Sequence, residues 1–471
     1  MAKAAHETSR VADKQSIRAE IELLREANEL VDINAPVDRE FELSAILERQ
    51  GQGPAIQFND VTGHRGPVVG NLLSSRHKMA AILGIPDAEL LPTLVRAIDH
   101  PIVPEEVTHA TCQEEVHSND VDLLKILPLG RQCAREQNPY ITAGVLITKE
   151  PTSDWQNVSI NRALVVGRDR LMIGMAPSHH LFRIASQQWA QGHSLEFAIA
   201  IGNPAAVVLA SNAYVGYGED ELAIAGGLLG ESLKIARCKT IQARVPALAE
   251  VIVEAEFHPH DVHDEGLVSE FHGLYEDYGP SPLARVRAVT HRRNFVFHTI
   301  AASRVPEHML IGAVMIEATL FRAIRAAVPS VRNVHVTLGG GGRMHCIVAL
   351  HTPPPGEGQR AVFAAFAHAN IIKHVVVVDD DIDIFNPADV DWAMATRLRA
   401  DRDILVVPRV RADRVDPVKE NRTVAKWALI ALKEPGKSPE SYERARAPRE
   451  VLEKVMQRWP EYFSRSSRRD K

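Results

Sequence analysis

The sequence predicts a mixed α/β fold, because helix-like and strand-like stretches alternate at both ends of the chain and short strands follow one another in the middle. With 471 residues, 45% of them hydrophobic, the chain can form about three domains with buried cores. We expect an N-terminal α/β domain over 1–115, a barrel-like domain over 116–305 and a C-terminal α/β domain over 306–435. A terminal helix and a basic tail are expected over 436–471.

The composition excludes several classes of function. The net charge is −6 and basic residues gather only at the last few positions, so no nucleic-acid partner is expected. The four cysteines lie far apart and form no Cys-x-x-Cys pair, which argues against a disulfide framework or a zinc site. The N-terminal residues lack the apolar core of a signal peptide, and no apolar run approaches the ~18 residues of a membrane span. We therefore expect a cytoplasmic protein with no membrane partner.

The N-terminal domain is predicted to be scaffold without catalytic chemistry. Apolar residues recur at helical spacing from Lys14 to Asn28, and the alternating LVDINAPVD that follows predicts a strand. A second helix is expected from Glu42 to Arg49.

The middle of the chain contains short strand-like runs, AGVLITK, NVSINRALVVG and RLMIGMAP, with Gly, Pro and Asn between them. Such a series favours a barrel-like sheet. Further on, apolar and polar residues alternate from Ala249 to Phe257, which predicts a half-buried strand. We expect a polar loop from His258 to Asp264 after it, which brings Glu265 and Glu270 to the edge of a cavity. Taken alone, two such carboxylates are more often solvated surface residues.

The C-terminal domain is predicted to open with one long helix, VPEHMLIGAVMIEATLFRAIRAAV, followed by strands separated by helices, so a mostly parallel sheet is expected. The run from Gly339 to Gly342 lacks the spacing of a phosphate-binding loop and is predicted to be flexible. Apolar residues near the C-terminus predict an amphipathic helix that packs on a neighbouring subunit or domain, with a disordered basic end, RSSRRDK. The residues on its apolar face are Val451, Leu452, Val455, Met456 and Trp459.

A set of motifs runs through the chain in a fixed order: NVSINR from Asn157 to Arg162, then His180, then GYGEDELAIAGG around Glu221, then VPALAE, then Glu-Gly-x3-Glu. In this order they resemble the UbiD family of decarboxylases, which use prenylated FMN. The resemblance implies that the central domain is a split β-barrel, related to flavin reductases, that holds the cofactor. It also implies a separate flavin prenyltransferase that supplies the cofactor.

The resemblance further implies the ligands of the cofactor. Asn157, His180 and Glu221 are expected to hold Mn²⁺ or Mg²⁺ against the cofactor phosphate, and backbone carbonyls near Ala210 and Ser211 could bind K⁺. Taken singly, each side chain could have a purely structural role. Asn157 could cap a turn, His180 could be a surface histidine, and Glu221 could lie in the first turn of a helix, where its charge favours the helix dipole. The remaining cofactor-binding candidates are Ser159, Ile160, Asn161, Arg162, His179 and Lys426.

The resemblance assigns the catalytic roles to Arg162, Glu265 and Glu270. Arg162 is expected to pair with the two carboxylates, Glu265 and Glu270, and to orient the substrate carboxylate together with Glu265. Glu270 is expected to protonate the carbon that loses CO₂. A proton donor must be neutral near pH 7, which burial and a second carboxylate can arrange. Because Arg162 follows Asn157 by five residues, the two side chains are expected on opposite sides of one strand.

The expected reaction is a reversible, non-oxidative decarboxylation of an aromatic, heteroaromatic or α,β-unsaturated acid by a homodimer or larger homo-oligomer. A second polar group on the substrate is expected, because polar residues flank the proposed site; they are His258, His260, His263, His272 and the segment from Thr290 to Phe295. The alternative is an FMN-binding oxidoreductase, or a non-catalytic flavin-binding subunit that kept the barrel.

Overall fold

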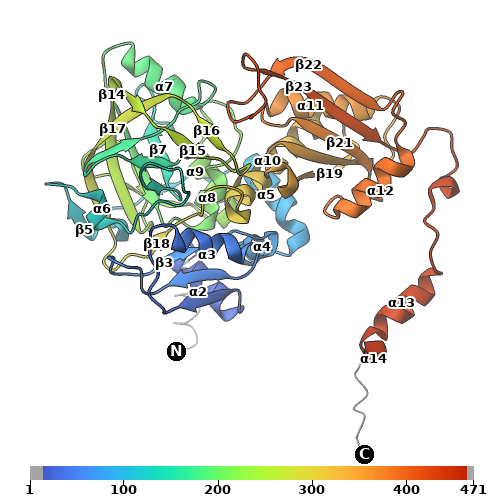
Figure 1. Ribbon diagram of the computed structural model, residues 1–471, viewed down its shortest axis with the longest axis horizontal. Coiled ribbons are helices and arrows are strands. Elements are labelled where there is room, and N and C mark those ends of the chain that lie inside the picture. The colour runs from blue at the N-terminus through green and yellow to red at the C-terminus, as the bar shows by residue number, and fades with distance from the viewer. Residues whose placement is uncertain (1–13, 464–471) are drawn as a thin grey trace, which may run out of the picture.

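The computed structural model describes residues 14–463, and Figure 1 shows a rounded body with a C-terminal arm that extends from it. The expected basic end, RSSRRDK, and the first thirteen residues lie outside the described part of the chain. The mixed α/β class predicted from the sequence is confirmed. No helix in the described part is both long and apolar enough to cross a membrane.

The N-terminal part contains a four-stranded sheet covered by helices. The helices are α2 (Ile17–Glu26), α3 (Glu42–Gln50), α4 (Arg76–Leu83) and α5 (Leu90–Asp99). The sheet has the order β1 (Leu30–Ile33), β2 (Ala55–Phe58), β3 (Val68–Gly70) and β18 (Phe297–His298). Strand β18 comes from far along the chain and pairs in parallel with β3 at the edge of this sheet. The N-terminal sheet is therefore completed by a segment that follows the barrel.

The central sheet has nine strands and curls on itself. Its order is β6 (Tyr140–Ile141), β9 (Ala163–Val165), β10 (Arg170–Met172), β17 (Pro280–His291), β14 (Val251–Asp264), β11 (Leu195–Ile201), β7 (Val145–Lys149) and β8 (Gln156–Ile160), and β5 (Glu115–His117) pairs with β17. Strands β6 and β9 lie at one end of this order and β7 and β8 at the other. Because β8 continues into β9 through only Asn161 and Arg162, the two ends must lie together. The sheet is a split barrel, and this link marks the split.

Smaller elements surround the barrel. The helices are α6 (Leu123–Ile126), α7 (His180–Trp189), α8 (Ala205–Ala210) and α9 (Glu221–Leu229). A three-stranded sheet has the order β13 (Arg244–Pro246), β12 (Lys234–Arg237) and β4 (Glu105–Glu106). Strands β15 (Leu267–Ser269) and β16 (Tyr275–Asp277) form a hairpin. This hairpin carries Glu270 at its turn.

The C-terminal sheet is mixed, with the order β19 (Val331–Val336), β20 (His345–Leu350), β21 (His374–Asp379), β23 (Thr423–Ala431) and β22 (Ile404–Arg411). Only the two central pairings are parallel, so the expectation of a mostly parallel sheet was wrong. Helices α11 (Glu357–His368) and α12 (Pro387–Arg397) separate the central strands. Only a short 3-10 helix, Leu338–Gly340, lies between β19 and β20, and no helix lies between β22 and β23, so each of these pairs runs antiparallel.

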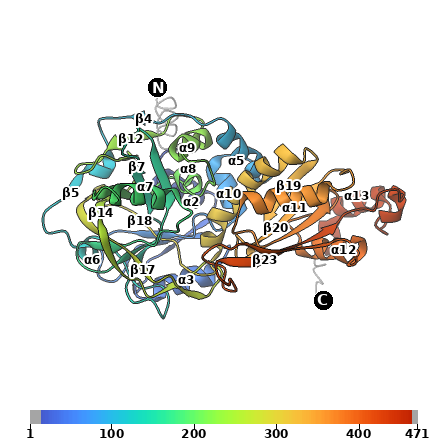
Figure 2. The same cartoon turned by 90° about the horizontal axis from the view of Figure 1, so that it is seen from above.

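Helix α10 (Pro306–Ala327) joins the two main parts of the body, and Figure 2 shows it between the barrel and the C-terminal sheet. Leu310 and Val314 belong to the core shared with the N-terminal helices, whereas Ala313 and Ile316 belong to the core of the C-terminal sheet. A helix buried on opposite faces fixes the positions of the layers that it touches. Side chains at its N-terminal end therefore reach the boundary between barrel and C-terminal domain.

The chain ends in two short helices, α13 (Arg449–Gln457) and α14 (Trp459–Phe463), instead of the single helix expected. Figure 1 shows both at the end of an extended segment, away from the body. Apolar side chains on them are exposed, among them Met456 and Tyr462 at 69% and 50%.

Candidate active site

A cavity of about 700 Å³ lies where the barrel meets the C-terminal domain. The link between β8 and β9 lines it, and so do the starts of α7 and α9, the β15–β16 hairpin and the first turns of α10. Charged and polar side chains of both domains converge here. They include Asn157, Arg162, His180, Glu221, Glu265, Glu270, Tyr278, His308, Arg343 and Arg414.

Arg162 and Glu270 form an ion pair in this cavity, in which Glu270 is buried and Arg162 partly buried. Arg162 Nη2 lies 2.8 Å from Glu270 Oε1, and the Tyr278 hydroxyl donates to the same oxygen at 2.7 Å. Arg162 Nη1 also donates to the carbonyl of Ser269, so the arginine is fixed to the hairpin at two successive residues. The hairpin turn, in which Gly273 has a φ of 88°, brings Tyr278 back beside Glu270.

The electrostatics of this cluster determine the charge of Glu270. Burial raises the pKa of its carboxyl, but the charge of Arg162 and the hydrogen bond from Tyr278 lower it further, to about 2. Glu270 is therefore a carboxylate at neutral pH while Arg162 remains its partner. The neutral acid expected from the sequence requires that Arg162 be engaged by another anion.

Glu265 lies in the same cavity with different partners. Tyr140 donates to Glu265 Oε1 at 3.3 Å and Ser281 donates to Oε2 at 2.7 Å. Of the two carboxylates expected to pair with Arg162, the structure pairs Glu270 with it, whereas Glu265 forms no ion pair with Arg162 among the described residues. The reason is the hairpin, which presents Ser269 and Glu270 together to the guanidinium, whereas Glu265 directly follows the end of β14.

Asn157 and Glu221 lie together at another part of the cavity. Asn157 is buried on β8, and its Nδ2 has no hydrogen-bond partner among the described residues. Glu221 begins α9, and its Oε2 accepts a hydrogen bond from the N–H of Val158 at 3.1 Å. Burial raises the pKa of Glu221 to about 8, although backbone N–H groups oppose this. A buried carboxylate beside an unpaired amide is a combination that a cation would stabilise.

His180 begins α7 and lines the same cavity. Its ring lies edge-on to Tyr217, with ring centroids 5.4 Å apart, and also contacts Trp155. Burial, together with the charge of Arg183, lowers the pKa of His180, so the imidazole is neutral as a metal ligand must be. The N-termini of α7 and α9 both meet this part of the cavity, where their dipoles favour an anion such as a phosphate.

The residues present fit a divalent cation with a phosphate, because an amide, an imidazole and a carboxylate suit such a cation. Among residues 14–463, however, no three His, Cys, Asp or Glu side chains form a group that could hold a metal by themselves. A divalent cation held here by His180 and Glu221 would therefore need the Asn157 amide as a further ligand.

The other predicted cofactor residues are divided between the cavity and its surroundings. Four of them line the cavity: Ser159, Ile160, Asn161 and His179. Lys426 does not line it, because Lys426 is buried within β23 and its Nζ donates to the carbonyl of Asn370 at 2.8 Å. Asn370 is itself a lining residue. The Ser211 carbonyl, a candidate K⁺ ligand, accepts a hydrogen bond from the N–H of Ile160 at 3.3 Å.

Asn157 and Arg162 line the same cavity, which corrects the expectation that they face opposite sides of a strand. Strand β8 ends at Ile160, so Arg162 belongs to the link into β9 and does not follow the alternation of the strand. At the split in the barrel, both side chains therefore line the same cavity.

The histidine-rich stretch lies elsewhere. The expected loop from His258 to Asp264 is the second half of β14, which continues past an irregularity in its pairing with β17 after Phe257. The side chains of His258 and His263 are 45% and 59% exposed, and neither these two nor His260 line the cavity. His272 is also outside the lining, and its Nε2 lies 3.0 Å from the carbonyl of Val415. The polar character of the site comes from other residues.

Sequence reasoning missed Tyr278, His308, Arg343 and Arg414, which all line the cavity. The Arg414 guanidinium lies 4.2 Å from the centre of the Tyr278 ring. Arg343 directly follows the glycine run, and this position next to Gly342 was the one available signal. The other three stand in no pattern that distinguishes them from surface residues.

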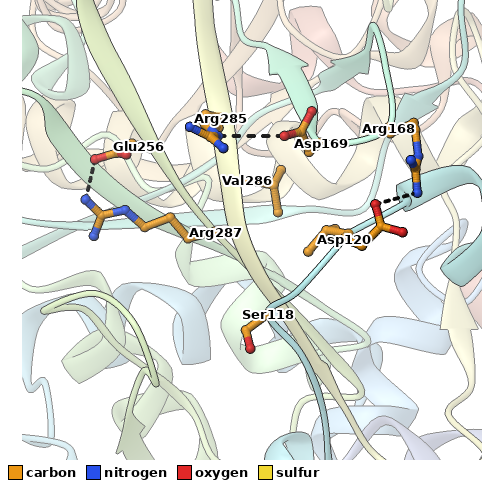
Figure 3. A pocket seen from close by; sticks show the side chains of 9 residues that line it. Ser118, Asp120, Arg168, Asp169, Glu256, Arg285, Val286 and Arg287 are labelled. Carbon is orange, nitrogen blue, oxygen red and sulfur yellow. Dashed lines mark hydrogen bonds and ion pairs between the residues drawn. The ribbon is translucent and has the colours of Figure 1, made fainter.

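A second cavity, of about 520 Å³, lies on the outer surface of the barrel (Figure 3). Its three arginines all have carboxylate partners: Arg168 lies 2.9 Å from Asp120, Arg285 lies 3.7 Å from Asp169, and Arg287 pairs with Glu256. Figure 3 shows the three pairs, each marked by a dashed line, among the residues that line this cavity. Because its charges are already compensated, this cavity has no evident anion site.

Three family models match the chain in sequence order. They describe the N-terminal domain of 3-octaprenyl-4-hydroxybenzoate carboxy-lyase over residues 21–98, its Rift-related domain over 105–305 and its C-terminal domain over 309–431. Anhydromevalonate phosphate decarboxylase of Methanosarcina mazei is 32% identical over 428 residues, which make up 91% of this chain and 98% of that protein.

Solved structures show the same similarity. The UbiD-class enzyme HmfF of Pelotomaculum thermopropionicum, in complex with FMN, matches with a TM-score of 0.89 and 37% identity over 93% of this chain and 98% of that one. The 3,4-dihydroxybenzoic acid decarboxylase AroY of Klebsiella pneumoniae matches with a TM-score of 0.86 and 26% identity over 96% of this chain and 100% of that one. An evolved dimeric form of HmfF in complex with prenylated FMN has a TM-score of 0.86 and 36% identity, covering 94% of this chain and 98% of that one.

Proposed function

Because the chain belongs to the UbiD family of carboxy-lyases, we propose that it catalyses the reversible, non-oxidative decarboxylation of an aromatic, heteroaromatic or α,β-unsaturated carboxylic acid with prenylated FMN. The observation that carries the proposal is the Arg162–Glu270 ion pair in the cavity, with Tyr278 on the same carboxylate oxygen. This pair provides a binding site for a carboxylate and a carboxyl group for proton transfer at adjacent positions.

Arg162 binds the substrate carboxylate in this proposal. Its planar guanidinium suits a carboxylate, and it is fixed by the Ser269 carbonyl on one side. When the substrate engages Arg162, Glu270 loses its counter-charge and gains a negative neighbour. Both changes raise the pKa of Glu270 from about 2, so the substrate itself brings the carboxyl toward its protonated form.

Glu270 then delivers a proton to the carbon from which CO₂ has left, and takes it back in the carboxylation direction. Its Oε1 is held by Arg162 and Tyr278, while its Oε2 has no hydrogen-bond donor among the described residues. That second oxygen is the one that can carry the proton into the cavity. Glu265, fixed by Tyr140 and Ser281, keeps a second carboxylate near the reaction site.

When bound in the cavity, prenylated FMN supplies the electron sink that decarboxylation at an sp² carbon requires and that no side chain provides. Asn157, His180 and Glu221 would hold Mn²⁺ or Mg²⁺ at the cofactor phosphate, beside the starts of α7 and α9. The lining residues Ser159, Ile160, Asn161 and His179 would contact the cofactor. The proposal also includes a K⁺ ion at the Ser211 carbonyl. Lys426 would support the cofactor site indirectly, because it holds the carbonyl of the lining residue Asn370.

The substrate class does not follow from the family alone. Relatives named anhydromevalonate phosphate decarboxylase and 3,4-dihydroxybenzoic acid decarboxylase represent two different kinds of acid. In this chain the apolar part of the cavity is formed by side chains such as Phe271, Ile300 and Ile311. An aromatic ring beside branched aliphatic side chains favours a planar apolar substrate, which an aryl or heteroaryl acid provides.

We further propose that the enzyme is cytoplasmic, forms a homodimer or larger homo-oligomer, and receives its cofactor from a separate flavin prenyltransferase.

The test is to produce the protein together with such a prenyltransferase and to screen aryl, heteroaryl and acrylic acids for CO₂ release. Release of CO₂ that depends on the prenyltransferase is expected. An ordinary flavin spectrum with no CO₂ release from any acid would support the alternative, a flavin-binding protein without this chemistry.

We predict that Glu270→Gln keeps the fold and the cofactor but lowers kcat by roughly a hundredfold or more, because the amide cannot deliver a proton. Cofactor content is measured by absorbance and turnover by CO₂ release. Glu276→Gln, a change in the same hairpin but outside the cavity lining, is the control and should retain turnover. Turnover near that of the wild type in cofactor-loaded Glu270→Gln would contradict the assignment.

A further inference from the structure

Arg343 is an arginine of the active-site cavity without a carboxylate partner. No carboxylate of residues 14–463 lies within ion-pair distance of it, in contrast to Arg162, which pairs with Glu270. Nη2 of Arg343 makes one long hydrogen bond, 3.4 Å, to the carbonyl of His308, and Nη1 has no partner among the described residues. Most of the N–H groups of this guanidinium are therefore unused.

The surrounding backbone is shaped to hold this side chain. A Cβ at Gly312 of α10 would lie 1.4 Å from Arg343 Nη1, so only a glycine there leaves room for the guanidinium. Gly342 has a φ of 68°, and a Cβ there would lie 2.8 Å from the carbonyl oxygen of Met309. The Arg343 guanidinium lies 5.1 Å from the centre of the Phe271 ring. The glycine run is thus a packed turn that directs the Arg343 side chain into the cavity, which corrects the expectation of a flexible loop.

The surroundings leave the charge of Arg343 poorly compensated. Burial lowers the pKa of Arg343, and the groups that oppose this are Tyr214, Glu270 and Asp413, none of which forms an ion pair with it. Glu270 is committed to Arg162. His308 lies beside it with a pKa lowered to about 3 by burial and by the charges of Arg162 and Arg343, so its ring is neutral. Its Nδ1 lies 3.0 Å from the carbonyl of Ser303 and must carry the hydrogen, which leaves Nε2 free as an acceptor.

We propose that Arg343 binds a second anionic group of the substrate, a carboxylate or a phosphate, apart from the carboxylate that is lost at Arg162. A partly buried guanidinium whose Nη1 is withdrawn from water and unpaired is costly without a counter-ion, and an anion that binds its N–H groups reduces that cost. His308 adds an acceptor for a hydroxyl or a protonated oxygen of the same group. This inference rests on the proposed function, since it concerns the far end of the same substrate.

Equilibrium binding tests the subsite without turnover. Protein produced without the prenyltransferase, which should not turn over, is titrated by calorimetry with furan-2-carboxylate and with furan-2,5-dicarboxylate. A third titration uses an enoic acid that carries a phosphate monoester. We expect the wild type to bind one of the two dianions at least roughly tenfold more tightly than the monoacid, because a charge-assisted hydrogen bond is worth about that much. The dianion that binds more tightly shows whether the subsite prefers a carboxylate or a phosphate.

Substitutions then locate the subsite. Arg343→Met should reduce the preference for the dianion to within about twofold, while Arg343→Lys, which keeps a charge without the planar fork, should retain part of it. Gly312→Ala, which displaces the guanidinium, should behave like Arg343→Met. Arg285→Met removes an arginine from the other cavity and should leave the preference unchanged.

The outcomes separate this inference from the proposed function. If Arg343→Met keeps the tighter binding of the dianion, the proposed subsite is wrong. The same conclusion follows if Arg414→Met, and not Arg343→Met, removes this tighter binding. No dianion preference in the wild type would also overturn the subsite, even if the cofactor-loaded enzyme releases CO₂ from monoacids. Conversely, a preference that depends on Arg343 supports the subsite even where no acid in the decarboxylation screen releases CO₂.

Discussion

Two donors share one oxygen of Glu270, and this arrangement sets the chemistry at the scale of single residues. A substrate carboxylate can attract the Arg162 guanidinium away from Glu270. The Tyr278 hydroxyl is uncharged, so the same carboxylate does not attract it and its hydrogen bond to Glu270 remains. Burial and the nearby Glu270 raise the pKa of Tyr278, so it stays a hydrogen-bond donor throughout the working pH range. Tyr278 therefore positions Glu270 in both of its charge states.

We predict that Tyr278→Phe lowers kcat by roughly tenfold and moves the alkaline limb of the kcat–pH profile upward by about one unit. The hydrogen bond from Tyr278 favours the ionised form of Glu270, so its removal raises the pKa of that carboxyl and extends the protonated form to higher pH. The measurement is CO₂ release across pH for the cofactor-loaded enzyme.

Tyr275→Phe is the matched control for that change, because Tyr275 lies in the same hairpin but outside the cavity lining. A lower kcat in Tyr278→Phe with no movement of the alkaline limb would mean that Tyr278 supports the hairpin only, without influencing the proton on Glu270.

At the scale of elements, a carboxylate of one helix caps another. Helix α8 begins after Pro204, which supplies no side-chain cap, and the N–H of Ala205 donates instead to Glu20 Oε1 of α2 at 2.7 Å. Burial raises the pKa of Glu20 to about 8, against the opposing hydrogen bond. Helix α8 leads to Ser211 and the cavity, so this contact between α2 and α8 supports the floor of the site.

The stability of the protein should depend on pH through Glu20. Between its ordinary pKa of 4.5 and about 8, the folded protein keeps a proton on Glu20 that the unfolded chain has lost. The free energy of unfolding therefore falls as the pH rises through this window, by up to roughly 5 kcal/mol, and this contribution levels off above it. Denaturant unfolding at several pH values measures the slope.

Glu20→Gln keeps an oxygen for the Ala205 N–H but has no proton to lose, so the slope in that window should become flatter. Glu22→Gln, on an exposed part of the same helix, is the control for the loss of one negative charge. An unchanged slope in Glu20→Gln would show that the titrating group lies elsewhere.

The elements show what the sequence could and could not predict. Strand and helix periods located most elements of the barrel and the C-terminal domain, including α10, because each buries an apolar face. Strand β23 was missed because the buried Lys426 and its neighbour Trp427 interrupt its apolar pattern; in the fold, the Asn370 carbonyl satisfies the ammonium group. The site depends on such distant partners. Motif order identified Arg162 and Glu270, but Arg343 enters the cavity only because Gly312, on another element, leaves room.

At the scale of the whole molecule, the C-terminal arm, which carries helices α13 and α14, exposes several large apolar side chains. The exposed side chains include Val451 at 44%, Leu452 at 38% and Met456 at 69%. Apolar residues at this spacing on one side of a helix usually mark an interaction surface. A second copy of the chain fits the homo-oligomer proposed above.

We predict that deletion of residues 447–471 shifts the protein to a smaller assembly, because the arm can no longer pack on a second copy. Light scattering after size-exclusion chromatography measures the mass. Leu452→Asp should have the same effect in the full-length chain, whereas Glu450→Ala, beside it on the same helix, should not. An unchanged mass after the deletion would exclude the arm as a subunit contact.

Strand β18 has a further consequence, for the order in which the protein can fold during synthesis. Its two residues, Phe297 and His298, pair with β3 and complete the N-terminal sheet. The ribosome must therefore release the entire barrel before the first sheet of the chain can close. Until then the edge of β3 remains open, and a nascent chain in this state offers a strand edge to other chains. Translation past residue 298 is thus the step that commits the N-terminal half of the molecule to its native form.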